Sequence, residues 1–213
     1  MGNIADIRKD YKQRSLLENE VRNNAFQQFD IWWKDAVNSE IDEVNALTLC
    51  TVSTSGKPSG RIVLLKGYDE KGFVFFTNYN SHKGKQLELN SNACMVFFWK
   101  ELERQVRIEG VINKINPDES DTYFFSRPLG SQVGAWASPQ STVIENREVI
   151  EENVERYTKE FNTHPITRPV HWGGYRLMPE SIEFWQGRSN RLHDRLLYTL
   201  QKNDQWKIER LAP

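Results

Sequence analysis

The chain has 213 residues, a mass of 25.0 kDa and a formal net charge of -1, from 28 Lys and Arg against 29 Asp and Glu. Its length favours a single domain over 1–213 rather than two small ones, and 38% hydrophobic residues with 12% aromatics suffice for one sizeable core, which excludes wholesale disorder. The near-neutral charge argues against a general nucleic-acid binder, and no window approaches the roughly 20 apolar residues of a membrane span.

The first predicted element is a helix near the N-terminus. Residues 1–16 mix charges of both signs without an apolar core segment, which argues against a secretory signal. We expect residues 1–20 to form a mobile segment. Apolar side chains then recur at helical spacing between Ala25 and Val37, which predicts an amphipathic helix.

Runs rich in Val, Thr, Leu and Phe follow, broken by turn sequences, and predict strands at 46–53, 59–68, 73–78, 93–99 and 103–115. Ser81 is placed to cap a short helix, and Asn116 to cap a helix at 118–126 with Pro117 in its first turn. A helix at 143–161 and strands at 171–178, 182–186, 194–201 and 205–211 complete the chain. Because alternating β-α-β units are missing, this order predicts a mainly β fold, an antiparallel sheet or barrel with helices on its outside.

The cysteines and histidines give no sign of a metal site. Cys50 and Cys94 lie in apolar, β-branched surroundings without a nearby His or second Cys. We interpret them as buried free thiols in a reducing compartment, the cytoplasm, rather than as a disulfide. None of the four His belongs to a ligand-spaced pair, so no structural metal is expected.

Two segments in the first half of the chain carry cations that could bind an anion. Alternation places Arg61 and Lys66 on opposite faces of a strand, unless a twist or bulge turns both toward one ligand. Taken alone, they are better explained as cations at solvated strand ends. Thr77 and Lys83 flank the point where a strand runs into a helix start, whose free N–H groups can bind an anion, although plain turns of this kind are common.

Tyr123, Arg127 and Ser131 are spaced by four and four. They would share one helix face, but Pro128 predicts a break after Arg127. A phenol, a guanidinium and a hydroxyl around a helix end suit a phosphate monoester. The spacing alone favours a helix-terminal Arg beside a partly buried Tyr.

The densest cluster lies near the C-terminus. Strand alternation places Arg191, His193 and Arg195 on one face, where they repel one another unless an anion lies against them. Trp185 adds a flat apolar wall for a planar ring. The alternative is a solvated edge strand with neighbouring acids as partners, and we favour the anion site.

These segments together resemble the pyridoxine (pyridoxamine) 5'-phosphate oxidase family. The family's signature is similar to a segment of this chain that begins with Glu183-Phe184-Trp185-Gln186 and, after four further residues, continues with Arg191-Leu192-His193-Asp194-Arg195. Residues 206–213 are similar to the family's usual C-terminal ending. The similarity covers nearly the whole chain from Arg8 onward. It implies a split β-barrel, antiparallel and Greek-key-like with flanking α-helices, that forms a homodimer with two FMN molecules at the subunit interface.

Matching the family's motifs implies two sets of site residues. FMN contacts would fall on Arg61, Ile62, Val63, Leu64, Leu65, Lys66, Phe76, Thr77, His82, Lys83, Gln105, Gln140, Ser141, Trp185 and Arg195. Substrate contacts would fall on Lys66, Tyr123, Arg127, Ser131, Arg191 and His193, with Arg8 and Tyr11 as a lid. Arg191 and His193 would be catalytic, orienting the ring and assisting proton removal, with the Arg lowering the pKa of the His. His82 stands where the family often has Arg, and it would bring one hydrogen bond without a fixed charge.

The implied activity is oxidation of pyridoxine 5'-phosphate and pyridoxamine 5'-phosphate to pyridoxal 5'-phosphate. Hydride would pass to flavin N5, and O2 would reoxidise the flavin to give hydrogen peroxide. Two alternatives stay open: a flavin or vitamer carrier without turnover, and a related flavin barrel that acts on another substrate. A second phosphate pocket argues against the carrier, since flavin binding alone does not need one.

Overall fold

The computed structural model describes residues 3–6 and 9–213. The chain divides into two compact units. Unit 1 comprises Met1–Leu49, Cys94–Gly110 and Pro179–Pro213, and unit 2 comprises Cys50–Ala93 and Val111–Met178. Several strands contribute residues to both units, and the single domain over 1–213 stays a prediction.

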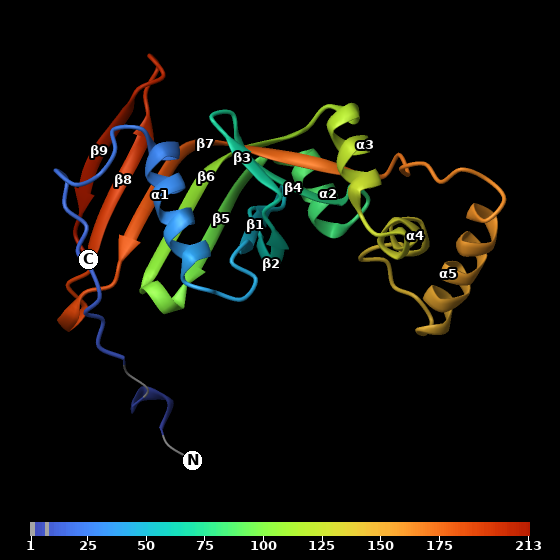
Figure 1. Ribbon diagram of the computed structural model, residues 1–213, viewed down its shortest axis with the longest axis horizontal. Helices are drawn as coiled ribbons and strands as arrows, with labels where there is room; N and C mark the ends of the chain where they lie inside the picture. The colour runs from blue at the N-terminus through green and yellow to red at the C-terminus, as the bar shows by residue number, and fades with distance from the viewer. Residues whose placement is uncertain (1–2, 7–8) are drawn as a thin grey trace. The chain divides into compact units, whose positions relative to one another are not determined.

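The elements follow one another as shown in Figure 1. In chain order they are η1 (Ile4–Asp6), α1 (Ala25–Asn38), β1 (Ala46–Val52), β2 (Pro58–Leu64), β3 (Gly67–Asp69), β4 (Gly72–Asn78), α2 (His82–Leu89), β5 (Asn92–Trp99), η2 (Lys100–Leu102), β6 (Arg104–Lys114), α3 (Pro117–Ser126), α4 (Leu129–Ala137), α5 (Glu148–Phe161), β7 (Trp172–Gln186), η3 (Ser189–Arg191), β8 (Asp194–Leu200) and β9 (Trp206–Leu211). Hydrogen-bonded strands run in the order β2-β1-β5-β6-β7-β4-β3, with β8 pairing β7 and β9. The pairings of β4 with β3 and β7, and of β8 with β7 and β9, are antiparallel. The mainly antiparallel β fold with helices is therefore confirmed.

Unit 1 has an aromatic core beneath α1. The Asn24 side chain caps this helix by accepting hydrogen bonds from two backbone N–H groups. Phe29 and Trp32 lie on the buried face of the helix, and the Phe29 ring centroid is 5.5 Å from that of Phe97. Trp32 meets Phe184 edge-on at 5.2 Å. The predicted amphipathic pattern thus packs one face of α1 on strand side chains.

In unit 2, local capping signals set two helix starts. The Ser81 hydroxyl accepts from Gly84 N at the start of α2, and the Asn116 side chain accepts from Asp118 N at the start of α3 with Pro117 in the first turn. Both caps confirm the predictions. A buried cluster of Phe124, Ala135 and Trp172 joins α3 and α4 to the first residue of β7.

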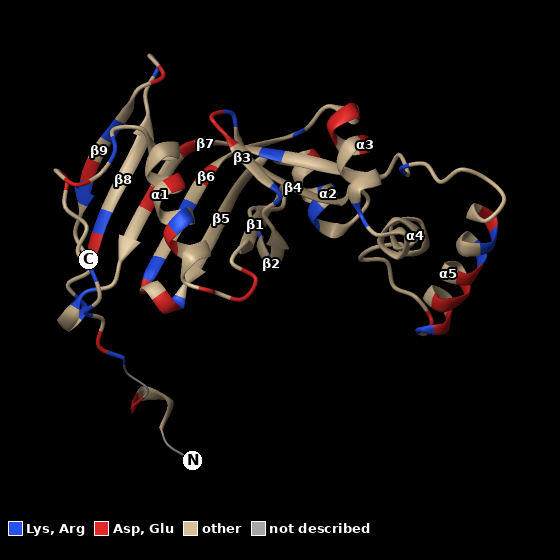
Figure 2. Ribbon diagram, in the orientation of Figure 1, with Lys and Arg blue, Asp and Glu red and all other residues tan. Residues whose placement is uncertain are grey.

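The acidic helix α5 begins at Glu148, five residues later than the start of the predicted 143–161 helix. None of its residues, all of which the structure describes, is buried. In Figure 2, where acidic residues are coloured red, red segments recur along the α5 ribbon and mark its Glu residues. Its Tyr157 and Phe161 rings lie 5.6 and 5.7 Å from the Trp136 ring of α4.

Two further predictions about elements were wrong, and one helix was not predicted. The predicted strand 59–68 ends at Leu64 and resumes at Gly67, and α4 was not predicted, because its small, uncharged residues give no amphipathic pattern. The predicted strands 171–178 and 182–186 are one strand, β7. Pro179 does not interrupt it there, since pairing with β4 stops at Leu177 and pairing with β8 starts at Ser181.

Cys50 and Cys94 are free thiols, as predicted, but each is half-buried rather than buried. Both occupy the less buried positions of their strands, whose residues alternate between the two faces. Within the described part of the chain, no helix has the length and apolarity to cross a membrane.

Candidate functional site

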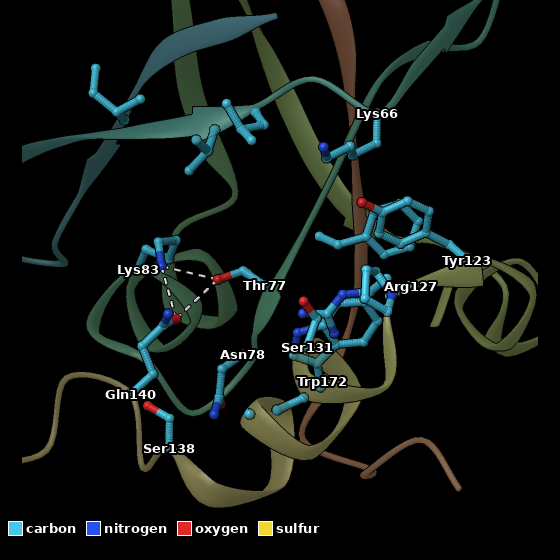
Figure 3. Close-up of a pocket in the computed structure, with 17 residues that line it drawn as sticks. Lys66, Thr77, Asn78, Lys83, Tyr123, Arg127, Ser131, Ser138, Gln140 and Trp172 are labelled. Carbon is cyan, nitrogen blue, oxygen red and sulfur yellow. Dashed lines mark hydrogen bonds between the residues drawn. The ribbon is translucent and has the colours of Figure 1, made fainter. Parts of the chain in front are cut away.

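A cavity of about 650 Å³ lies in unit 2 (Figure 3), within the range of small-molecule sites. Its lining includes many residues that the sequence assigned to ligands: Ile62, Val63, Leu64, Lys66, Phe76, Thr77, Lys83, Tyr123, Arg127, Ser131 and Gln140. Side chains from β2, from the β4–α2 turn and from the α3–α4 junction, far apart in sequence, therefore share one space.

One group of polar side chains lies where β4 ends and α2 begins. Lys83 Nζ donates to Thr77 Oγ1 at 3.0 Å and to Gln140 Oε1 at 3.1 Å, and Thr77 Oγ1 donates to the same Gln140 oxygen at 3.1 Å. Burial, and then the charge of Arg61, lowers the pKa of Lys83 to about 8. The ammonium is thus a poorly solvated cation with neutral partners, which an anion beside it would stabilise.

Arg61, on β2, does not line the cavity, but its charge contributes to the lowered pKa of Lys83. Its Nη1 donates to Thr51 Oγ1 at 2.6 Å, and burial lowers its pKa. The consecutive residues Ile62, Val63 and Leu64 at the end of β2 all line the cavity, although alternate residues of a strand point to opposite faces. The expectation that Arg61 and Lys66 lie on opposite faces of one strand is therefore wrong, because Lys66 lies outside the strand.

A second group lies at the junction between α3 and α4. The break predicted at Pro128 is present: Arg127 has extended backbone, with φ -79 and ψ 150, as the residue before a proline favours. Its guanidinium carbon lies 4.6 Å from the centre of the Trp172 ring. Among the described residues, no group accepts a hydrogen bond from its buried Nη1, and burial lowers the pKa of Arg127. Tyr123 and Ser131 line the same cavity, so the break brings the predicted trio together.

Stacked aromatic rings form the apolar wall of the cavity. Phe76 and Tyr123 stack with centroids 3.9 Å apart, and Phe76 and Trp172 stack at 5.5 Å. Such rings offer a flat surface to a planar ligand. The sequence reasoning missed Trp172, since no spacing connects it with Arg127, and it also missed Asn78 and Ser138 in the lining.

Three other predicted residues form an aromatic cluster in unit 1. The Trp185 and His193 ring centroids are 4.6 Å apart, and Tyr11 lies 5.9 Å from Trp185 and 6.1 Å from His193. His193 Nδ1 accepts from Arg188 N at 3.1 Å. Burial lowers the pKa of His193, and the charge of Arg191 lowers it further, as predicted.

The prediction that Arg191, His193 and Arg195 share a strand face is wrong. β8 begins only at Asp194, and Arg191 ends a short 3-10 turn with φ 61, where it is exposed. Arg195 lies in a bidentate ion pair with Glu183, at 2.8 and 3.2 Å. The Arg195 charge is thus compensated within the protein, as in the alternative that the sequence left open.

Other residues assigned to FMN do not line the cavity. Leu65 is buried in the core, His82 is exposed at the first position of α2, and Ser141 is exposed with φ 69. Gln105 is half-buried on β6 in unit 1. Arg8 lies outside the described residues.

The comparisons with known proteins agree on one family. The family model for pyridoxamine 5'-phosphate oxidase matches residues 33–160, and that for the pyridoxine 5'-phosphate oxidase C-terminal dimerisation region matches residues 172–213. A pyridoxine/pyridoxamine 5'-phosphate oxidase of Cyanothece sp. (strain PCC 7425 / ATCC 29141) is 57% identical over 99% of this chain and 98% of its own.

Solved structures share the fold. PhzG from Burkholderia lata 383, in complex with tetrahydrophenazine-1-carboxylic acid, has a TM-score of 0.86 at 29% identity, over 93% of this chain and 98% of its own. A pyridoxamine 5'-phosphate oxidase-related, FMN-binding protein from Nostoc punctiforme PCC 73102 has a TM-score of 0.70 at 18% identity, over 91% and 100%. The predicted split-barrel fold class is thereby confirmed.

Proposed function

Because the chain belongs to the pyridoxamine 5'-phosphate oxidase family, we propose that it is an FMN-dependent oxidase of pyridoxine 5'-phosphate and pyridoxamine 5'-phosphate, with pyridoxal 5'-phosphate as product. The observation that carries this substrate class is the buried Arg127 Nη1, which no described group satisfies. A buried N–H without an acceptor is costly, and such groups are rare unless a ligand completes them. A phosphate monoester supplies acceptor oxygens, and Tyr123 and Ser131 add donors in the same cavity.

The second polar group suits the phosphate of a flavin mononucleotide. We propose that Lys83, Thr77 and Gln140 bind it at the start of α2, where free backbone N–H groups add donors and Arg61 adds positive charge. A desolvated ammonium with only neutral partners fits an anion better than it fits its present surroundings. When bound, FMN supplies the two-electron acceptor and passes the electrons to O2, which leaves as hydrogen peroxide.

The chain itself orients the substrate and keeps water away. The stacked wall of Phe76, Tyr123 and Trp172 fixes the plane of an aromatic ring, while Arg127 and Lys66 fix its phosphate. Positioning of this kind replaces a bimolecular encounter with a pre-arranged one.

Arg191 and His193 are the proposed catalytic residues. The lowered pKa keeps His193 neutral at pH 7, and its Nδ1 accepts a hydrogen bond from Arg188, so the ring proton is on Nε2. In this tautomer Nε2 donates to a substrate oxygen or nitrogen. We therefore propose that His193 chiefly orients the substrate, and that proton removal by this ring would require it to break the bond to Arg188.

We further propose a homodimer with FMN at the subunit interface, working in the cytoplasm. The match of residues 172–213 to a dimerisation region supports the dimer, and the free thiols of Cys50 and Cys94 are compatible with a reducing compartment.

One experiment tests the function. The purified protein is loaded with FMN, given pyridoxine 5'-phosphate in air, and followed for aldehyde and peroxide, with unphosphorylated pyridoxine as the control. We expect both products from the phosphorylated substrate and far less from the control. A flavin-loaded protein that gives neither product would exclude the oxidase. PhzG binds tetrahydrophenazine-1-carboxylic acid. If the protein preferred a reduced phenazine carboxylic acid of this kind, that result would indicate a PhzG-like substrate rather than a vitamer phosphate.

A further inference from the structure

Glu103 is a buried carboxylate whose partners come from the N-terminal segment. Its side chain is 3% exposed, and its Oε2 accepts hydrogen bonds from Lys12 N at 2.9 Å and from Gln13 N at 3.2 Å. Lys9 Nζ lies 3.6 Å from Oε1. Residues 9–13, here called the strap, therefore supply the partners of a buried carboxylate, which is costly to leave unpaired.

Glu103 caps the C-terminal end of η2, where its backbone N–H donates to Lys100 O at 3.2 Å. With φ 55, Glu103 is in the left-handed region, which Gly or Asn would adopt more easily. Its carbonyl oxygen accepts from Gly187 N at 2.7 Å and from Gln186 Nε2 at 3.2 Å. The residue thus joins the strap to the end of β7, next to Trp185. Strain kept at such a junction points to a role for the side chain.

The strap places Tyr11 against the cluster of Trp185 and His193. A Cβ added at Gly187 would lie 2.7 Å from atoms of the Tyr11 ring. The Tyr11 ring can therefore occupy its observed place only while residue 187 is glycine. Ser189 Oγ donates to Tyr11 O at 3.2 Å. Beyond the strap, Leu16 is buried and has its own bond to Asp194. Loss of the Glu103 contacts would therefore loosen the strap, which would keep the Gln13 Nε2 bond to Glu101 O at 2.7 Å and the Ser189 bond to Tyr11 O, while the chain from Leu16 onward stays attached.

We propose that Glu103 is a positioning residue, which holds Tyr11 over Trp185 and His193 through the Lys12 and Gln13 amides. Its kinetic consequence rests on the proposed function, in which His193 contacts the substrate: Tyr11, held beside His193, slows substrate release. The carboxylate is needed because its negative charge strengthens both N–H bonds at Oε2 and its Oε1 faces the Lys9 ammonium, where an uncharged amide would present an NH2 group.

The test compares two variants with the matched control Glu101→Gln. Glu103→Gln weakens the hydrogen bonds to the Lys12 and Gln13 amides, and Gly187→Ala places a methyl group against the Tyr11 ring. Glu101 is exposed and its carboxylate pairs only with Lys100, at 3.6 Å, among the described residues. Hydrogen exchange of the Lys12 and Gln13 amides is measured on the FMN-loaded proteins, together with KM and kcat for pyridoxine 5'-phosphate.

We expect Glu103→Gln to speed exchange of both amides by about ten-fold or more. In both strap variants KM should rise about five-fold with kcat nearly unchanged, and the double variant should be no worse than either single one. The Glu101→Gln control should match the wild type in all three measurements.

Unchanged exchange in Glu103→Gln, equal acceleration in Glu101→Gln, or additive effects in the double variant would each overturn the proposal. Failure of the proposed function looks different. In that case no variant oxidises the substrate, while the exchange comparison still decides whether Glu103 anchors the strap.

Discussion

Replacing Arg127 by methionine should separate ligand binding from stability. Arg127→Met keeps a long side chain over the Trp172 ring and removes the buried Nη1 that has no described partner. Leaving such an N–H unsatisfied costs about 1–3 kcal/mol. The lost cation–π contact, about 0.5–2 kcal/mol, is offset in part by a sulfur–aromatic contact of about 0.3–1.5 kcal/mol. The ligand-free variant should therefore be as stable as the wild type or about 1 kcal/mol more stable.

The same change should damage turnover selectively. A hydrogen bond from a charged donor is worth about 1.5–3 kcal/mol, so loss of the guanidinium should lower kcat/KM for pyridoxine 5'-phosphate by about 10- to 100-fold. Activity on unphosphorylated pyridoxine should change little. The assays are initial rates on both substrates and thermal unfolding without ligand, where about 1 kcal/mol corresponds to roughly 2–4 °C.

Arg156→Met is the matched control, since Arg156 lies 4.7 Å from the Tyr157 ring on the exposed helix α5. It should change neither turnover nor substrate preference. Equal losses of Arg127→Met on both substrates would refute the assignment of Arg127 to a phosphate. A clear drop in its melting temperature would refute the reasoning about the unsatisfied N–H.

Three further predictions concern α2 and its surroundings. The lowered pKa of Lys83, about 8, means that its charge is lost as pH rises through 8 rather than 10.5, so FMN affinity should be full below that pH and fall about ten-fold or more by pH 9.5 in a fluorescence titration. Lys83→Gln should bind weakly at every pH, and a slope that persists in it would assign the titration elsewhere. His82→Arg should leave FMN affinity unchanged or tighter, because it adds a fixed charge beside Lys83; marked weakening would reveal a specific role for the imidazole. Gly84→Ala should destabilise by about 1–3 kcal/mol in chemical denaturation, because its Cβ would overlap the Tyr79 carbonyl, whereas Gly134→Ala, with open space at its Cβ, should not.

Local signals in the sequence predicted the elements that depend on neighbouring residues. The caps at Ser81 and Asn116 and the break at Pro128 each involve atoms within a few positions of one another, and the structure contains all three. β7 was predicted as two strands because Pro179 normally ends a ladder, and only the positions of its partner strands show why it does not.

The site required long-range information. Residue types predicted which side chains suit a phosphate, but not that Trp172 would lie beneath Arg127, since the helices α4 and α5 and their loops separate the two residues in sequence. Arg195 shows the opposite error. Its alternation with His193 suggested an unmet charge, while the pairing of β7 with β8 supplies Glu183 on a neighbouring strand.

Two separate stretches of chain supply most of the polar lining of the cavity, the turn from β4 into α2 and the junction of α3 with α4, while Lys66, Ser138 and Gln140 add to it from other loops. On the proposed assignment, the first holds the cofactor and the second recognises the substrate. Substitutions at sites with no shared partners act independently. New substrates could therefore arise in this family through changes at the junction alone while flavin retention is inherited intact, an evolutionary freedom that would let one scaffold serve several pathways.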